Sequence, residues 1–122
     1  MAATKKTFLL ICRHAPYGGS LAREALDVAL TAATFDQPVA LLFLGDGVQQ
    51  LLRAQHPDAI AQRALDKQLA ALPLYDVDTI YVEADALRAR GLNTADLALP
   101  ASALTREQIA EQIAAHDIVL GF

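Results

Sequence analysis

The chain has 122 residues, which is enough for one domain with a hydrophobic core but too few for two. Apolar residues make up 54% of the sequence and charged residues 20%, a composition that excludes a disordered or low-complexity protein. Ten Lys and Arg stand against fourteen Asp and Glu, and the resulting net charge of −4 argues against direct binding to nucleic acid or to an anionic membrane.

The only cysteine, Cys12, lies in a short apolar run. One cysteine cannot form an internal disulfide, which suits a reducing compartment. The run covers residues 7–12 and ends at Arg13 and His14, so it is too short for a signal peptide or a membrane span. We therefore expect a single cytoplasmic domain over residues 1–122.

A strand and a helix are the first predicted elements. Residues 6–12 are apolar at consecutive positions, as expected of a strand covered on both faces. Gly18 and Gly19 predict a turn, and Ser20 is the predicted N-cap of a helix over residues 20–34. This helix is apolar over most of its circumference. Packing on one face of a sheet requires a narrower apolar arc than this. Either a second neighbour such as another subunit covers the remaining apolar surface of the helix, or its alanines are exposed and are present because alanine is a good helix former.

The middle of the chain predicts a second strand and two helices. Residues 38–45 are a buried strand by the same criterion, and Gly45-Asp46-Gly47 then turns the chain into a short helix around residues 48–52. The longer helix lies between the start signal His56-Pro57-Asp58 and the stop signal Pro73. Its apolar stripe consists of Ala61, Leu65, Leu69 and Leu72.

A strand over residues 77–83 and a helix over residues 84–90, ended by Gly91, come next. Residues 97–101 are a candidate short strand. Pro100 has no N–H to donate to a ladder, so this strand would lie at an edge or at a terminus of the sheet.

The last helix has the clearest start signal in the sequence. Thr105 and Gln108 form a capping box, and Leu104 with Ile109 forms the hydrophobic staple. Residues 117–122 are the final strand. Helices that join successive strands predict an α/β fold, a three-layer α/β/α sandwich with an open, mainly parallel five-stranded sheet.

Cys12 is the first candidate for chemistry, because ligands of open parallel sheets bind at the carboxyl ends of strands. A reactive thiol needs solvent access and nearby positive charge, and neighbours in sequence such as Arg13 and His14 do not guarantee either. Cysteine is also among the residues most often buried. A small core residue is the favoured interpretation of Cys12, and a catalytic thiol is the alternative.

No metal or cofactor is predicted. The three histidines, at positions 14, 56 and 116, lack metal-ligand spacing. Gly18-Gly19 and Gly45-Asp46-Gly47 match neither a dinucleotide-binding fingerprint nor a P-loop, so turns are the default interpretation. A stand-alone phosphate- or nucleotide-binding α/β module remains an alternative.

Several short stretches, in their order along the chain, carry a resemblance to one known family. They are Ala15-Pro16-Tyr17-Gly18, Arg23-Glu24-Ala25-Leu26-Asp27, Gly45-Asp46-Gly47-Val48-Gln49-Gln50-Leu51-Leu52, Gln55-His56-Pro57-Asp58, Leu74-Tyr75-Asp76-Val77 and Leu87-Arg88-Ala89-Arg90-Gly91-Leu92. The chain resembles the DsrE/DsrF-like sulfur-relay family, and within it the TusC (DsrF) subunits, from the first strand to Phe122. The resemblance implies an α/β sandwich with a parallel sheet.

The same resemblance implies partners. It points to a cytoplasmic TusBCD-type complex, a dimer of heterotrimers, in which TusB-like and TusD-like chains accompany this one. Such a complex passes persulfide sulfur from a TusA-like carrier toward a TusE-like carrier for 2-thiolation of the tRNA wobble uridine.

The resemblance also bears on where sulfur is carried. The carrier cysteine of the TusD (DsrE) subunits lies at the end of the third strand, some seven residues before an Arg-Gly pair. Counting back from Arg90-Gly91, that position is Glu83. A carboxylate cannot form the S–S bond that persulfide transfer requires. Glu83 has either a structural role, as an anion at a helix start, or an electrostatic role at a site shared with a partner.

Together, these residues and the resemblance predict a non-catalytic subunit of a sulfur-relay complex, with no catalytic residue of its own. The competing interpretation is a sulfurtransferase that uses Cys12.

Overall fold

The structure is a computed structural model that describes residues 5–15, 20–52 and 67–122. Its elements are β1 (Phe8–Cys12), α1 (Leu21–Thr34), β2 (Val39–Phe43), η1 (Gly45–Leu51), η2 (Leu72–Tyr75), β3 (Thr79–Glu83), α3 (Ala84–Ala89), η3 (Thr94–Asp96), β4 (Ser102–Leu104), α4 (Arg106–Ala115) and β5 (Ile118–Gly121), where η marks a 3-10 helix. Residues 67–71 form an α-helical segment directly before η2.

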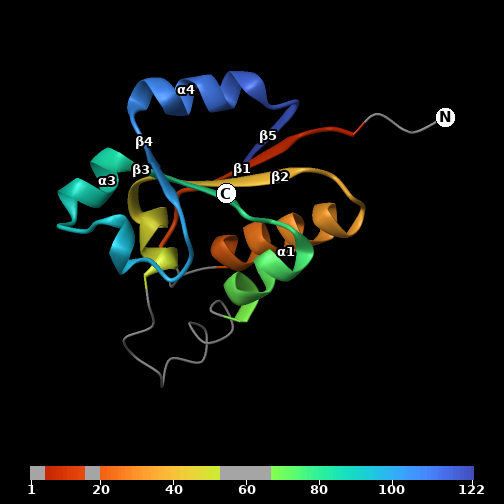
Figure 1. The fold of residues 1–122 in the computed structure, drawn as a ribbon, viewed down its shortest axis with the longest axis horizontal. Helices are drawn as coiled ribbons and strands as arrows, with labels where there is room; N and C mark the ends of the chain where they lie inside the picture. The colour runs from red at the N-terminus through yellow and green to blue at the C-terminus, as the bar shows by residue number, and fades with distance from the viewer. Residues whose placement is uncertain (1–4, 16–19, 53–66) are drawn as a thin grey trace.

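The strands form one five-stranded sheet in the order β4-β3-β2-β1-β5, and every neighbouring pair is parallel. This confirms the predicted parallel α/β sheet and supplies the strand order. The chain steps outward from β1 to β4 and then returns through α4 to place β5 on the other side of β1 (Figure 1). The central strand β2 is buried at all five positions, which explains its unbroken apolar sequence.

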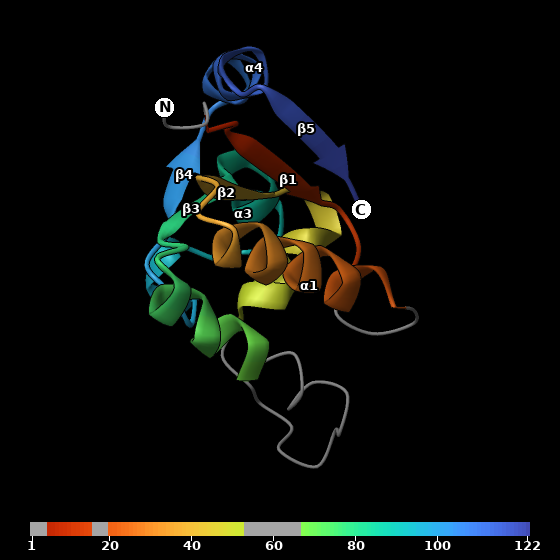
Figure 2. The ribbon, with the colours of Figure 1, turned by 90° about the vertical axis from the view of Figure 1, so that its right-hand side faces the viewer.

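Helices cover both faces of the sheet, as predicted. Figure 2 shows α4 on one side of the strands and α1 on the other. Alternate residues of β1 serve the two faces, because successive side chains of a strand point in opposite directions. Leu10 and Cys12 belong to the large core on the α1 side, whereas Leu9 belongs to the smaller core on the α4 side, with Ile11 packed against it.

The predicted start of α4 is confirmed in detail. The Thr105 hydroxyl accepts a hydrogen bond from the Gln108 N–H at 3.2 Å, and the Gln108 side chain accepts one from the Thr105 N–H at 2.9 Å. Leu104 and Ile109 lie in the same core cluster, as the staple predicts. The end of α3 is confirmed as well, since Gly91 follows the helix with a φ of +66° that favours glycine.

The strand predicted over residues 97–101 is wrong. The edge strand is β4, Ser102–Leu104, and Leu97 makes only an isolated antiparallel bridge to Leu52. The η3 turn, capped by Asn93, precedes this stretch, and Pro100 cannot donate to a ladder, so pairing with β3 begins only after Pro100.

Two helix starts also differ from expectation. Ser20 does stand at the N-cap of α1, but its side chain makes no capping hydrogen bond to the backbone and instead lies 3.4 Å from the Glu24 carboxylate. The short helix predicted around residues 48–52 is the 3-10 helix η1, which already begins at Gly45. Gly18, Gly19 and most of the predicted helix after Pro57 lie outside the described residues.

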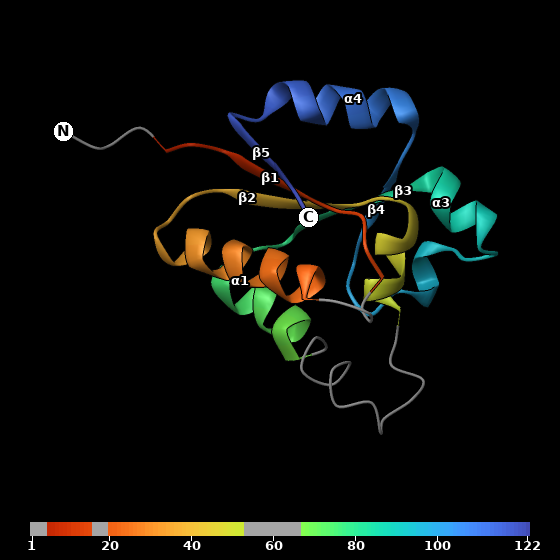
Figure 3. The same cartoon turned by 180° about the vertical axis from the view of Figure 1, so that it is seen from behind.

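The second neighbour of α1 belongs to the same chain. The segment 67–75 lies beside α1 on the same face of the sheet (Figure 3), and Gln68 Nε2 donates to Asp27 Oδ1 at 2.6 Å. Leu69 and Leu72 from this segment join the core that α1 covers. Much of the apolar surplus of α1 is therefore used inside the chain. Among the described residues, no helix is long and apolar enough to cross a membrane.

Candidate functional site

The candidate site is the edge of the sheet at which the parallel strands β1, β2 and β3 end. Because these strands run in the same direction, the residues that follow them come together at this carboxyl edge. It is built from the end of β1, the η1 turn after β2, and Glu83 with α3 after β3. In Figure 1, η1 and α3 lie side by side at this edge, and they are in contact.

The η1 turn is seated directly on the end of β1. The Leu44 N–H donates to the Cys12 carbonyl at 3.0 Å, and Gly47 packs against the same carbonyl. A Cβ at Gly47 would lie 2.0 Å from the Cys12 oxygen, which is shorter than real contacts allow. The predicted turn at Gly45-Asp46-Gly47 therefore requires glycine at its third position for close backbone approach.

Glu83 links the end of β3 to the same turn. Its Oε1 accepts a hydrogen bond from the Gly45 N–H at 2.9 Å, in a half-buried position. Glu83 stands at the N-cap of α3, so its charge lies at a helix start as expected, although its side chain makes no capping bond to that helix. The carboxylate instead satisfies the first N–H of η1 and ties two neighbouring strand ends together.

A second contact joins α3 to η1. Arg90 donates to Asp46 Oδ1 at 2.6 Å and to the Ala86 carbonyl at 3.0 Å. The sequence predicted that Asp46 lies near a helix start but did not predict this ion pair. Arg90 was noted in the sequence as part of the Arg90-Gly91 pair. Asp46 lies 44 residues away from it in sequence, and only the fold brings the two side chains together.

Cys12 is 1% exposed and belongs to the core between the sheet and α1. Burial raises the pKa of its thiol to about 12, because the apolar surroundings disfavour the thiolate. Arg13 and His14, which follow it in sequence, are exposed. A buried thiol with so high a pKa is a poor nucleophile.

The end of β1 is held by backbone and amide contacts. The Arg13 N–H donates to the Phe122 carbonyl at 3.0 Å, and the buried Gln50 donates through Nε2 to the His14 carbonyl at 2.7 Å. No local pattern in the sequence indicated this role of Gln50. His116 lies at the other end of the molecule, with Nδ1 2.7 Å from the Gln112 carbonyl, and His56 lies outside the described residues. Within residues 5–15, 20–52 and 67–122, no three His, Cys, Asp or Glu residues form a metal-binding group.

The sequence model of the DsrE/DsrF-like family matches residues 6–122. The chain belongs to the DsrE/DsrF-like family. The resemblance inferred from the short sequence stretches is thereby confirmed.

Several known proteins are similar to this chain over most of its length. Protein TusC homolog of Pseudomonas aeruginosa is 43% identical over 94% of this chain and 97% of its own length, and Protein TusC homolog of Vibrio parahaemolyticus is 36% identical over 90% and 93%. Intracellular sulfur oxidation protein DsrF of Allochromatium vinosum is 45% identical over 80% of this chain and 71% of its own length. The crystal structure of ychN protein from E. coli superposes with a TM-score of 0.81 at 22% identity, covering 98% of this chain and 100% of that one, which confirms the fold.

Proposed function

We propose that this chain is a non-catalytic subunit of a sulfur-relay complex of the TusBCD type, which passes persulfide sulfur for 2-thiolation of the wobble uridine in tRNA. Membership of the DsrE/DsrF-like family and the similarity to two TusC homologs over at least 90% of the chain support the relay. The residues at the carboxyl edge support the non-catalytic role.

The observation that carries this role is the carboxylate of Glu83. By resemblance, the end of β3 is the position at which the TusD-type subunits carry sulfur on cysteine. Transfer of a persulfide requires a thiolate that attacks sulfur and a thiol that leaves, and a carboxylate can be neither in that exchange. The Glu83 Oε1 is engaged with the Gly45 N–H at 2.9 Å, so the side chain here braces the edge instead.

The alternative, a sulfurtransferase that uses Cys12, has little support from the geometry. The Cys12 thiol is buried in the core between the sheet and α1, and its pKa of about 12 leaves almost no thiolate near neutral pH. Desolvation in this apolar core is the cause of the raised pKa.

The proposed partners are a TusB-like and a TusD-like chain, arranged with this subunit as a dimer of heterotrimers. The TusD-like chain carries the sulfur, which arrives from a TusA-like carrier and leaves toward a TusE-like carrier. The role of this subunit in the assembly is structural, through its contacts with the other subunits.

A sulfur-loading experiment tests the non-catalytic role. The purified chain is incubated with a cysteine desulfurase and cysteine, and its intact mass is measured. We expect no rapid adduct, whereas a persulfide on Cys12 would add about 32 Da. The Cys12→Ala variant is the matched control, because it shows whether any adduct resides on this thiol. A fast, stoichiometric adduct that the control lacks would overturn the proposal.

Co-expression tests the assembly. The chain is produced together with TusB-like and TusD-like chains of the same genome and separated by size-exclusion chromatography. We expect the three to elute together as one species larger than any single chain. Elution of this chain alone, as a monomer, contradicts the proposal.

A further inference from the structure

The strand β5 ends the sheet on one side, and no strand of the described residues pairs with its outer edge. Its neighbour on the inner side is β1. Figure 2 shows β5 as the outermost strand on that side of the sheet. Val119 and Leu120 are each 37% exposed, although they belong to opposite faces of the sheet. An exposed apolar strand edge is a template for pairing with another strand.

The other edge of the sheet is protected against such pairing. The edge strand there is β4, which has only three residues, and Pro100 lies just before it. Short strands, prolines and lysines are the devices that keep sheet edges apart. The strand β5 contains neither a proline nor a lysine. Its edge is therefore the one that is open to a further strand.

The hydrogen bonds of β5 show which of its backbone groups point outward. The N–H groups of Ile118 and Phe122 donate to carbonyls on the β1 side, at 3.0 and 2.8 Å. Successive residues of a strand direct their backbone groups to opposite sides. The N–H and C=O groups of Val119 and Gly121 therefore point away from the sheet, where another strand could bond them.

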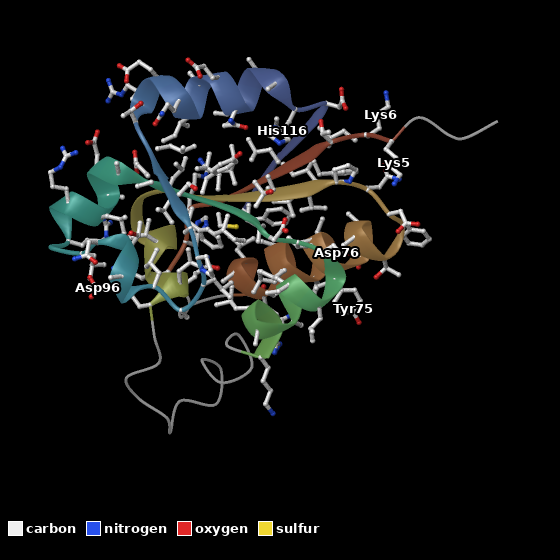
Figure 4. The ribbon with its side chains drawn as sticks, in the orientation of Figure 1. Lys5, Lys6, Tyr75, Asp76, Asp96 and His116 are labelled. Carbon is white, nitrogen blue, oxygen red and sulfur yellow. The ribbon has the colours of Figure 1, made fainter. Side chains whose placement is uncertain are left out.

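A carboxylate stands at the start of this edge. The Asp117 side chain is exposed, and its Oδ2 accepts both hydrogen bonds that Thr7 donates, at 2.9 and 3.0 Å. Lys6 and His116, both labelled in Figure 4, lie near enough to act on this carboxylate from within the chain. Among the described residues, however, none donates a hydrogen bond to its Oδ1, so this oxygen is available to a partner.

A guanidinium stands at the end of the same edge. Nη2 of Arg13 is 3.7 Å from the position that a Cβ on Gly121 would take, so the side chain lies over this glycine. Arg13 is exposed and forms no ion pair with a described residue. Asp117, Val119 and Gly121 share one face of the sheet, because they occupy alternate positions. The two opposite charges therefore lie on one face, at the two ends of the edge.

These features are complementary to themselves under a two-fold rotation. In an antiparallel pairing with Val119 opposite Val119 of a second copy, the two residues exchange two hydrogen bonds, and Gly121 comes opposite Asp117 of that copy. Opposed residues in such a pair have Cα atoms about 5.5 Å apart, so each guanidinium is within reach of the other copy's carboxylate. A second copy supplies the matching strand and charges by symmetry alone.

We propose that two copies of this chain associate through their β5 edges, antiparallel, with Val119 on the two-fold axis and an ion pair between Arg13 and Asp117 at each end. The inference goes beyond the proposed function and does not depend on it, because no relay partner takes part in the contact. The contact joins two five-stranded sheets edge to edge. Each copy has one such edge, so the association closes at a dimer, and the short contact makes the dimer dependent on concentration.

A charged substitution on the axis tests the contact. Sedimentation velocity of the full chain, at concentrations up to about 1 mM, measures the dimer. Val119→Lys places an ammonium group opposite its own copy, and we expect it to weaken the dimer about 30-fold or more. Ile113→Lys is the matched control, because Ile113 is 41% exposed on α4 and the variant adds the same charge elsewhere. It should dimerise as the wild type does.

A pair of charge reversals tests the register. Arg13→Glu and Asp117→Lys should each weaken self-association about 10-fold or more, because each brings like charges together twice in its own dimer. Mixed in equal amounts, the two variants should form a heterodimer about as stable as the wild-type dimer, because both of its ion pairs are then between opposite charges. Native mass spectrometry measures the three species. Circular dichroism and thermal unfolding check that each variant is folded.

Amide hydrogen exchange tests the position of the contact. The amides of Val119 and Gly121 should exchange about 10-fold more slowly at concentrations where the dimer forms, because they become hydrogen-bonded across the axis. The amides of Ile118 and Phe122 are already bonded within the chain and should change less.

Several outcomes would overturn the inference. They are a wild-type chain that stays monomeric over the whole concentration range, a dimer that Val119→Lys leaves unchanged, and folded charge variants whose mixture fails to recover the dimer. Protection of the Val119 and Gly121 amides only in the co-expressed complex would show that a different chain occupies the edge, and would also overturn it. None of these results bears on sulfur loading of Cys12 or on co-elution with the relay partners, so the proposed function is judged separately.

Discussion

Substitution of Glu83 tests whether its carboxylate braces the carboxyl edge. The Ala variant removes the acceptor of the Gly45 N–H, and the Gln variant keeps a neutral acceptor of nearly the same shape. Comparison of the two separates the hydrogen bond from the charge. Neither variant adds a thiol, so the effect on stability is independent of sulfur chemistry.

The expected magnitude follows from the geometry. A hydrogen bond to a charged group contributes about 1.5–3 kcal/mol, and solvent screening at this half-buried position lowers that to about 1–2 kcal/mol. For a chain of 122 residues the entropy of unfolding is about 0.26 kcal/mol per degree, so Glu83→Ala should lower the Tm by about 4–8 °C. Glu83→Gln keeps a neutral hydrogen bond but loses its charge assistance and the favourable charge at the start of α3, so its loss of stability should be smaller than that of Glu83→Ala.

Urea titration and differential scanning calorimetry of the purified chain measure these differences. Glu111→Ala is the control, because Glu111 is an exposed carboxylate on α4 and its removal should change the unfolding free energy by less than about 0.5 kcal/mol. If Glu83→Ala is as stable as the wild type, the Glu83 carboxylate does not hold the turn and the structural role assigned to it is refuted.

Four further variants and measurements follow from the fold. Gly47→Ala should destabilise the chain by about 3 kcal/mol, because its Cβ would lie 2.0 Å from the Cys12 carbonyl oxygen. Wild-type stability in urea would mean that the turn is not seated on β1. Thr105→Ala should cost about 1 kcal/mol through loss of the capping box, whereas Thr105→Ser should restore most of it, again by urea titration. The backbone and side-chain hydrogen bonds from Thr7 hold the pKa of Asp117 below its unfolded value, so this carboxylate stabilises the fold above about pH 4. That contribution to the unfolding free energy is lost as the pH falls through the folded pKa. Asp117→Asn should therefore flatten the acid side of the plot of stability against pH, and an unchanged plot would contradict this. The pKa of about 12 lowers the thiolate fraction of Cys12 by about 1,000-fold. A disulfide reagent should therefore modify Cys12 in the urea-unfolded chain but scarcely in the native chain. Fast reaction in the native chain would show that the thiol is accessible.

Local signals in the sequence predicted those elements whose residues act on their own neighbours. The capping box of Thr105 and Gln108 spans four residues, so the start of α4 could be read without the fold. The buried strands β1 and β2 were equally clear, because central strands of a parallel sheet are apolar at consecutive positions. The edge strand β4 was misplaced because three residues, two of them exposed, carry no such pattern.

The site was predictable only in part. The family resemblance singled out Glu83, and the match of the DsrE/DsrF-like family to residues 6–122 confirms the resemblance. The equivalence of Glu83 with the carrier position stays a prediction. The bond of Glu83 to the Gly45 N–H crosses 38 residues, and the pair Arg90 and Asp46 crosses 44, so no local pattern could announce either contact. The burial of Cys12 was expected from residue type, but the closure of η1 over its carbonyl was not.

By itself, the sequence determined the alternation of apolar strands and amphipathic helices, and with it a parallel α/β fold, because hydrophobic periodicity and capping act over a few residues. Only the tertiary structure decided the strand order, the partner of the Glu83 carboxylate and the second neighbour of α1, which is the segment 67–75 of the same chain. These features depend on which distant segments pack together. The packing of distant segments depends on burial of apolar surface over the whole chain, so it cannot be predicted from any single stretch of the sequence.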